Sequence, residues 1–128
     1  MDTNQVRSFV AGGTITEYAL VSLDAAGKVQ VTTAATDFKA IGVAQRAASS
    51  GEVVEVLVYG FTRAIAGASL TFASTPILAA TTAGKLQAAE ASDTTFYPVC
   101  RVIPNINQVS AADGEQIEVF FFGPTTLV

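Results

Sequence analysis

The chain repeats one short pattern, and this repetition constrains its fold more than any other feature. The segment 10–16 (VAGGTIT) has a later counterpart, at an offset of 55, in the segment 65–71 (IAGASLT). Further matches in the same order pair 27–30 with 84–87, 35–37 with 91–93, 43–44 with 99–100, 51–52 with 114–115 and 55–60 with 118–123. A duplicated unit is therefore predicted, with repeat 1 at about 10–60 and repeat 2 at about 65–123.

The offset between the two copies is nearly constant up to the match of 43–44 with 99–100, and it is larger for the matches that follow. It is 56 for the match at 43–44 and 63 for the match at 51–52. We therefore expect seven extra residues in the second copy, in an enlarged loop at 101–113 that contains the turn-forming sequence PNINQ. Chance similarity within a chain rich in alanine, threonine and valine is the alternative explanation of the matches.

Short stretches of strand-favouring residues, separated by turn residues, indicate the class of fold. Residues 20–23 and 28–31 flank the turn 24–27, which is typical of a β-hairpin. Residues 40–44 and the longer run 52–60 are rich in residues that favour strands. No window shows a sustained helical period, so we predict an all-β fold, a small barrel or sandwich built from the internal duplication.

Length and the position of the first repeat suggest the domain organisation. A chain of 128 residues fits a single domain. We predict one β domain at 10–128 and an N-terminal arm at 1–9, because the arm residues precede the duplicated unit. A disordered terminus is the alternative for the arm.

The long predicted strand has apolar residues on both of its faces. One face carries Val54, Val56 and Val58, and the opposite face carries Tyr59 and Phe61. A small domain has its core on one side of such a strand, so the second face needs another cover. Either the strand lies at the centre of a sandwich, or its second face is a subunit interface. The residues that we assign to such an interface are Tyr59, Phe61, Phe120 and Phe122.

Charge and hydropathy argue against nucleic acid and membrane as partners. The net charge is −4 and the seven basic residues are scattered, whereas phosphate binding needs clustered Lys and Arg. Residues 64–84 carry no charge over a length close to a membrane span, but they include Pro76, two glycines and many Ser and Thr. Only 14% of all residues are charged, so we expect other protein to cover part of the surface.

Residues that carry chemistry are nearly absent. The chain has no His and one Cys, so the usual zinc ligand sets cannot form, and Cys100 is predicted to be a small buried side chain. Glu52 and Glu55 are three residues apart, which places them on opposite faces of a strand and argues against a catalytic pair. Gly27-Lys28 lacks the earlier glycine and the following Ser or Thr of a phosphate-binding loop. We therefore expect no enzyme activity, no metal and no cofactor.

Several short motifs, taken together, resemble a known family. They are FVAG at 9–12, GKV at 27–29, ATD at 35–37, IGVA at 41–44 and GEVVEV at 51–56. This order resembles the capsid cement, or head decoration, proteins of tailed phages, some of which carry a label as RecA-like recombinases. The resemblance covers about 9–60 and, more weakly, the second copy. The recombinase label implies ATP binding, which the missing phosphate-binding loop contradicts.

The resemblance implies a clip- or tulip-like small β-barrel that forms homotrimers on the outer surface of the capsid. Such proteins bind the major capsid protein and bridge its neighbouring subunits, so the expected location is the virion, after synthesis in the host cytoplasm. As a hypothesis, the arm lies on the capsid with contacts from Asn4, Val6, Arg7 and Phe9. The main alternative is a binding β-domain of a phage fibre, baseplate or adhesin, and an enzyme with an unfamiliar site ranks last.

Overall fold

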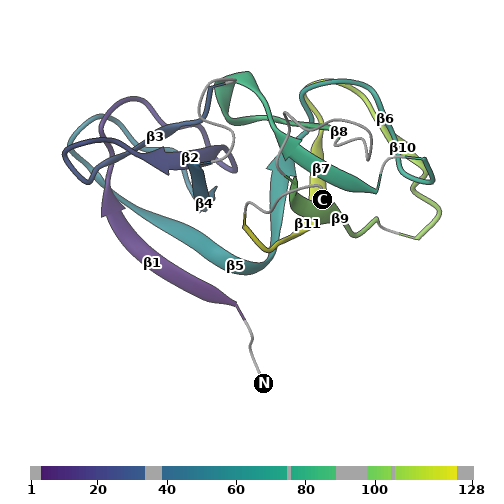
Figure 1. Ribbon diagram of the computed structural model, residues 1–128, viewed down its shortest axis with the longest axis horizontal. Coiled ribbons are helices and arrows are strands. Elements are labelled where there is room, and N and C mark those ends of the chain that lie inside the picture. The colour runs from purple at the N-terminus through teal and green to yellow at the C-terminus, as the bar shows by residue number, and fades with distance from the viewer. Residues whose placement is uncertain (1–3, 34–38, 75, 89–97, 105, 124–128) are drawn as a thin grey trace.

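The computed structural model describes residues 4–33, 39–74, 76–88, 98–104 and 106–123, which form an all-β protein. The predicted class of fold is therefore confirmed, and Figure 1 shows a strongly curved sheet. A short 3₁₀ turn, η2 (Thr82–Gly84), follows the seventh strand. The strands are β1 (Gln5–Val10), β2 (Leu20–Leu23), β3 (Val29–Val31), β4 (Ala40–Ala44), β5 (Val53–Ile65), β6 (Leu70–Thr71), β7 (Ile77–Ala80), β8 (Leu86–Ala88), β9 (Pro98–Val102), β10 (Ser110–Ala111) and β11 (Gln116–Phe121).

One long strand, β5, joins two lobes of similar structure. The main sheet has the strand order β3-β2-β4-β5-β11-β9-β7-β8, and β1 pairs with the first half of β5. The second half of β5 pairs with β11. We call the described residues before Gly60 the first lobe and those after it the second lobe. Figure 1 shows the lobes side by side, with β5 passing along both.

The two lobes make matching backbone hydrogen bonds. In the first lobe the Ala11 N–H donates to the Glu52 carbonyl at 2.8 Å, and in the second the Ala66 N–H donates to the Glu115 carbonyl at 2.8 Å. The strand pairs match as well, because β1 lies on β5 in the register in which the second half of β5 lies on β11. An offset of 55 relates β1 to the second half of β5, and an offset of 63 relates the first half of β5 to β11. The sequence matches at the two ends of the repeat have the same offsets.

The structure corrects one sequence match, that of 43–44 with 99–100. Val43 pairs with Leu57 in the first lobe, and the residue in this position of the second lobe, opposite Phe120, is Arg101. The offset is therefore 58 and not 56, so the loop between β9 and β10 is longer by five residues rather than seven. Short Ala- and Val-rich strands align well at several offsets, and the hydrogen-bond register decides between them. The matched segments 35–37 and 91–93 lie outside the described residues.

Each lobe has a hydrophobic core, and the two cores use equivalent positions. The first-lobe core consists of Ala11, Ile15, Val21, Val29, Ala44, Ala48, Val54 and Val56. The second-lobe core contains their equivalents Ala66, Leu70, Leu78, Leu86, Val102, Ala111, Ile117 and Val119. It also contains residues of the first lobe, among them Leu20, Val43 and Leu57. The second core therefore continues across the boundary and holds the lobes together.

Two predicted boundaries differ from the structure. The strand predicted at 52–60 continues to Ile65, because β11 pairs with its second half. Within the predicted arm at 1–9, the residues from Gln5 onward belong to β1 (Gln5–Val10), which pairs with β5. Residues 1–3 lie outside the described residues. The first residues of β1 have no place in the sequence repeat, and the apolar run of β5 does not show which segment will pair with it.

Gly60 lets β5 bend at the boundary between the lobes. Its φ of +130° lies in a region that other residues rarely adopt. The side chain of Asn4 lies beside it: Nδ2 donates to the Phe61 carbonyl at 3.1 Å, and the Phe61 N–H donates to Oδ1 at 2.9 Å. A Cβ on Gly60 would come within 2.9 Å of Asn4 Cα. Asn4 thus fastens the start of the described chain to the bend in β5.

Candidate functional site

Three aromatic rings form an exposed patch where β5 and β11 pair. The ring centroid of Phe120 lies 5.1 Å from that of Tyr59 and 5.0 Å from that of Phe61. Tyr59 and Phe61 are 46% and 53% exposed, and Phe120 is half-buried. Phe122 follows the end of β11, where its N–H donates to the Val99 carbonyl at 2.9 Å. The structure thus brings together three of the four residues assigned to a subunit interface, whose role stays a prediction.

The four residues assigned to capsid contact lie on β1 or next to it, but they do not share one surface. Val6 is 49% exposed and Arg7 is also exposed. Phe9 is half-buried and packs against the first-lobe core, and the Asn4 side chain is bonded to the Phe61 backbone. Asn4 and Phe9 therefore stabilise the fold, whereas Val6 and Arg7 face outward. Contact of any of them with a capsid stays a prediction.

An apolar strip lies on β1 and the adjoining end of β5. It consists of Val6, Val10 and Val53, which are 49%, 38% and 49% exposed, and we call it the β1 strip. Val10 pairs with Val53 across the strands, and Val6 lies four residues before Val10 on the same side of β1. Among the described strands, only β5 pairs with β1, so the other edge of β1 is open. The strip and this edge offer a partner apolar contacts and backbone hydrogen bonds.

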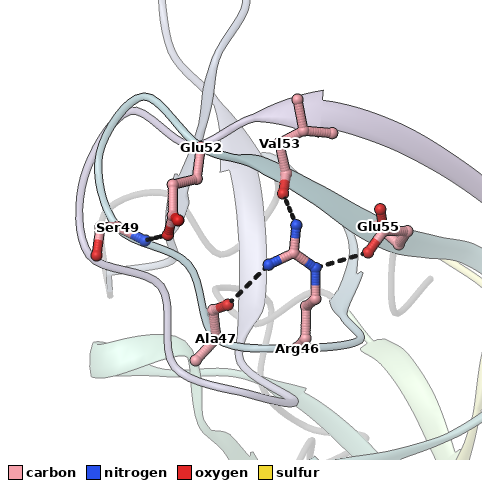
Figure 2. A network of polar contacts seen from close by, with 6 residues as sticks. All are labelled: Arg46, Ala47, Ser49, Glu52, Val53 and Glu55. Atoms are coloured by element: carbon pink, nitrogen blue, oxygen red, sulfur yellow. Dashed lines mark hydrogen bonds and ion pairs between the residues drawn. The ribbon is translucent and has the colours of Figure 1, made fainter.

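A polar network holds the turn between β4 and β5, as Figure 2 shows. Arg46 Nε donates to Glu55 Oε1 at 2.8 Å, and the other guanidinium nitrogens donate to two backbone carbonyls, one of them that of Val53. The hydrogen bond from Arg46 holds the pKa of Glu55 below its usual value. In the same turn the Ser49 N–H donates to Glu52 Oε1 at 2.6 Å. Both carboxylates therefore have structural partners.

The equivalent carboxylates of the second lobe also have structural partners. Glu115 Oε1 accepts a hydrogen bond from the Ala112 N–H at 2.9 Å, and Glu118 lies 4.0 Å from the guanidinium of its cross-strand neighbour Arg63. Cys100 is buried, as predicted, and this burial raises the pKa of its thiol. The described residues contain no group of three His, Cys, Asp or Glu side chains that could hold a metal ion. They also contain no helix long and apolar enough to cross a membrane.

Sequence reasoning missed two exposed apolar features. Leu23, the last residue of β2, is 45% exposed beside the hairpin turn. In the enlarged loop Ile106 and Val109 are 93% and 70% exposed, and Val109 borders an apolar pocket with Phe72. The extra length of the loop in the second copy was a signal for the second feature. Strand alternation puts Leu23 on the same face as the buried Val21, so the sequence carries no signal for its exposure.

The fold defines the class of the protein: an all-β protein with two lobes built on one sheet. No protein-family model matches the chain, and no curated protein matches it. Among solved structures, it is similar to the N base of the head fiber protein gp8.5 of bacteriophage phi29. The TM-score is 0.69 at 14% sequence identity, over 94% of this chain and 95% of the other. The two proteins therefore share a fold over almost their whole compared length.

Proposed function

We propose that this chain is a structural protein of a bacteriophage virion that binds the outer surface of the head as a cement protein. The observation that carries the proposal is the likeness of nearly the whole fold to the base of a phage head fiber. The order of short motifs that resembles the head decoration proteins supports the same assignment independently. The partner is then the major capsid protein, and the role is to bridge neighbouring capsid subunits.

Surfaces built for contact support this role. The β1 strip offers apolar side chains and an open strand edge to a capsid subunit. The aromatic patch of Tyr59, Phe61 and Phe120 lies where β5 and β11 pair, and we propose that a second copy of the chain covers it. We propose a homotrimer, because three linked copies convert weak single contacts with the capsid into strong overall attachment.

A mixing experiment tests the proposal. Purified protein is added to expanded heads that lack it, the heads are sedimented, and bound copies are counted at increasing protein concentration. A cement protein saturates at a fixed number of copies per head and raises the temperature at which the heads release DNA. Absence of saturable binding would contradict the proposal.

Variants on β1 test where the head is bound. Val6→Asp puts a charge at one end of the β1 strip, where Val6 is half exposed, so it is expected to weaken head binding at least about tenfold. Ser50→Asp adds the same charge to an exposed turn outside the strip and serves as the control. Deletion of residues 2–8 is not suitable, because it removes most of β1 from the sheet.

A second candidate, the base of a fibre, is favoured by the name of the structural neighbour. In this second proposal the chain binds the head but does not bridge capsid subunits. The mixing experiment separates the two functions, since saturable binding with an unchanged temperature of DNA release favours the fibre base.

A further inference from the structure

Equivalent rows of side chains cross the sheet in the two lobes. Cross-strand neighbours point to the same side of a sheet, so each row forms a continuous surface. The first row crosses β2, β4, β5 and β1 and consists of Leu20, Val43, Leu57 and Val6. The second row crosses β7, β9, β11 and β5 and consists of Ile77, Arg101, Phe120 and Phe61.

The first row is mostly covered, and the second row is open. Leu20, Val43 and Leu57 are exposed by 0%, 0% and 1%, and all three belong to the second-lobe core. At the equivalent positions, Arg101 is exposed and Ile77 and Phe120 are only half-buried. The surface that the second lobe covers on the first is therefore left uncovered on the second.

The hairpin turn of the second lobe packs against the Leu20 end of the first row. A Cβ added to Gly84, at the end of η2, would lie 2.7 Å from Ala19 Cβ and 2.9 Å from the Leu20 carbonyl oxygen. The fully buried Thr32 donates through Oγ1 to the Thr81 carbonyl at 3.2 Å across the same contact. The two lobes thus meet through different surfaces, a row on one and a turn on the other, which is a head-to-tail contact.

The equivalent turn of the first lobe is uncovered. Gly27 corresponds to Gly84, and a Cβ added to it meets no atom within 4 Å. Leu23, just before this turn, is 45% exposed, whereas its equivalent Ala80 is 0% exposed. Asp24 orders the turn from within, because its Oδ1 accepts two backbone hydrogen bonds. One lobe therefore has an open turn and the other an open row.

We infer that these two open surfaces bind each other between copies of the chain. Leu23 and the turn at 24–28 of one copy pack on the second row of the next copy from its Ile77 end, as η2 packs against the equivalent Leu20 end of the first row within one chain. The contact buries Leu23 and Phe120, and it brings the carboxylate of Asp24 to the face that carries Arg101. A head-to-tail contact repeats from copy to copy until a ring closes. The inference rests on the proposed self-association and names the surfaces that produce it.

Surface variants test this assignment by light scattering. Wild-type protein is expected to have a mass at least twice the 13.2 kDa of a single chain. Leu23→Asp and Arg101→Glu, one on each surface, are expected to weaken association at least about tenfold and to leave a circular dichroism spectrum of folded β-protein. Ile106→Asp changes a side chain that is 93% exposed and belongs to neither surface, so it should keep the wild-type mass. A wild-type monomer, or either interface variant at full mass, overturns the inference.

Cross-linking tests the head-to-tail geometry. Chains with Ala26→Cys are mixed with chains with Ile77→Cys, and a short thiol cross-linker is added; Cys100 is buried. A heterodimer of the two variants is expected, with little product from either variant alone. Products formed by one variant alone, without the heterodimer, would indicate a two-fold contact and overturn the inference.

Failure of this inference is distinguishable from failure of the proposed function. If the protein binds heads but stays monomeric, only the inferred contact between copies is wrong. If the protein assembles through Leu23 and Arg101 but does not bind heads, only the proposed head-binding function is wrong.

Discussion

At the scale of single residues, side chains hold the backbone at its least regular points. Asn4 bonds both backbone groups of Phe61 beside the bend at Gly60. Asp24 holds the first hairpin turn, where Gln30 Nε2 also donates to its Oδ2 at 3.0 Å. Such local hydrogen bonds decide which turn conformations are stable, and they can be tested one residue at a time.

Gly60→Ala is expected to destabilise the protein by about 1–3 kcal/mol, because φ is +130° there and the added Cβ would collide with Asn4. Urea denaturation measures the change in the free energy of unfolding. Gly13→Ala is the matched control, since Gly13 has no positive φ and its nearest neighbour, Gln30 Oε1, is at 3.4 Å. Equal effects of the two substitutions would contradict this account of the bend.

Asp24 is expected to make stability depend on acid pH. The hydrogen bond from Gln30, followed by that from the Lys28 N–H, lowers the pKa of Asp24. A lowered pKa in the folded state means that the stabilisation is complete above the unfolded pKa of about 4 and is lost as pH falls through the folded pKa. Thermal melting between neutral and strongly acid pH measures this loss. In Asp24→Asn the loss of thermal stability at acid pH should be smaller than in the wild type, and an unchanged pH profile would refute the role of this carboxylate.

At the scale of elements, β5 and the turn that leads into it organise the molecule. β5 has 13 residues and pairs with β1, β4 and β11. The turn before β5 is held by Arg46, which reaches Glu55 and the Val53 carbonyl (Figure 2). The second lobe replaces this turn by its longer loop and pairs Glu118 with Arg63 instead. Equivalent strands are thus entered by different turns.

Arg46→Met is expected to raise the pKa of Glu55 toward its ordinary value, because the hydrogen bond from Arg46 is the main cause of the lowered pKa. Arg46→Lys keeps the charge but loses the planar guanidinium, so its effect should lie between those of Met and wild type. Titration of the Glu55 carboxyl carbon by NMR gives the three values. Arg63→Met, which removes the partner of Glu118, is the control and should leave Glu55 unchanged.

At the scale of the whole molecule, the lobes share one core. Leu20, Val43 and Leu57 come from the first lobe and belong to the second-lobe cluster. The buried Thr32 adds a hydrogen bond to Thr81 across the boundary. Separation of the lobes would expose these side chains to water, so folding of one lobe depends on the other.

Leu57→Ala is expected to destabilise both lobes together by about 2–5 kcal/mol, since Leu57 is 1% exposed and joins the two lobes. Native-state hydrogen exchange at Val21 and Leu78, equivalent core residues of the two lobes, measures the free energy of opening in each. Equal losses at both amides are expected, and Val109→Ala at a 70% exposed site is the control. A loss confined to one lobe would show that the lobes unfold separately.

Much of the local structure could be predicted from the sequence. The predicted hairpin lies at β2 and β3, and the strand at 40–44 is β4. Three of the four aromatic residues assigned to an interface form one patch. The sequence did not predict that β1 joins the sheet or that Asn4 and Phe9 stabilise the fold. These features depend on pairing between segments far apart in the chain, for which a single sequence has no local signal.

The sequence by itself determined the all-β class, the positions of the turns and the poverty in reactive side chains, because these follow from composition and from patterns a few residues long. Only the tertiary structure decided the offset of 58 between β4 and β9. It also decided which of the two equivalent rows of side chains, that of Leu57 or that of Phe120, is buried. Leu57 and Phe120 hold equivalent positions in the two copies, yet the second lobe buries the first of them and leaves the second half exposed. The physical reason is that burial is settled by what packs on a surface, and in a tandem pair only one of two equivalent surfaces has a neighbour within the chain.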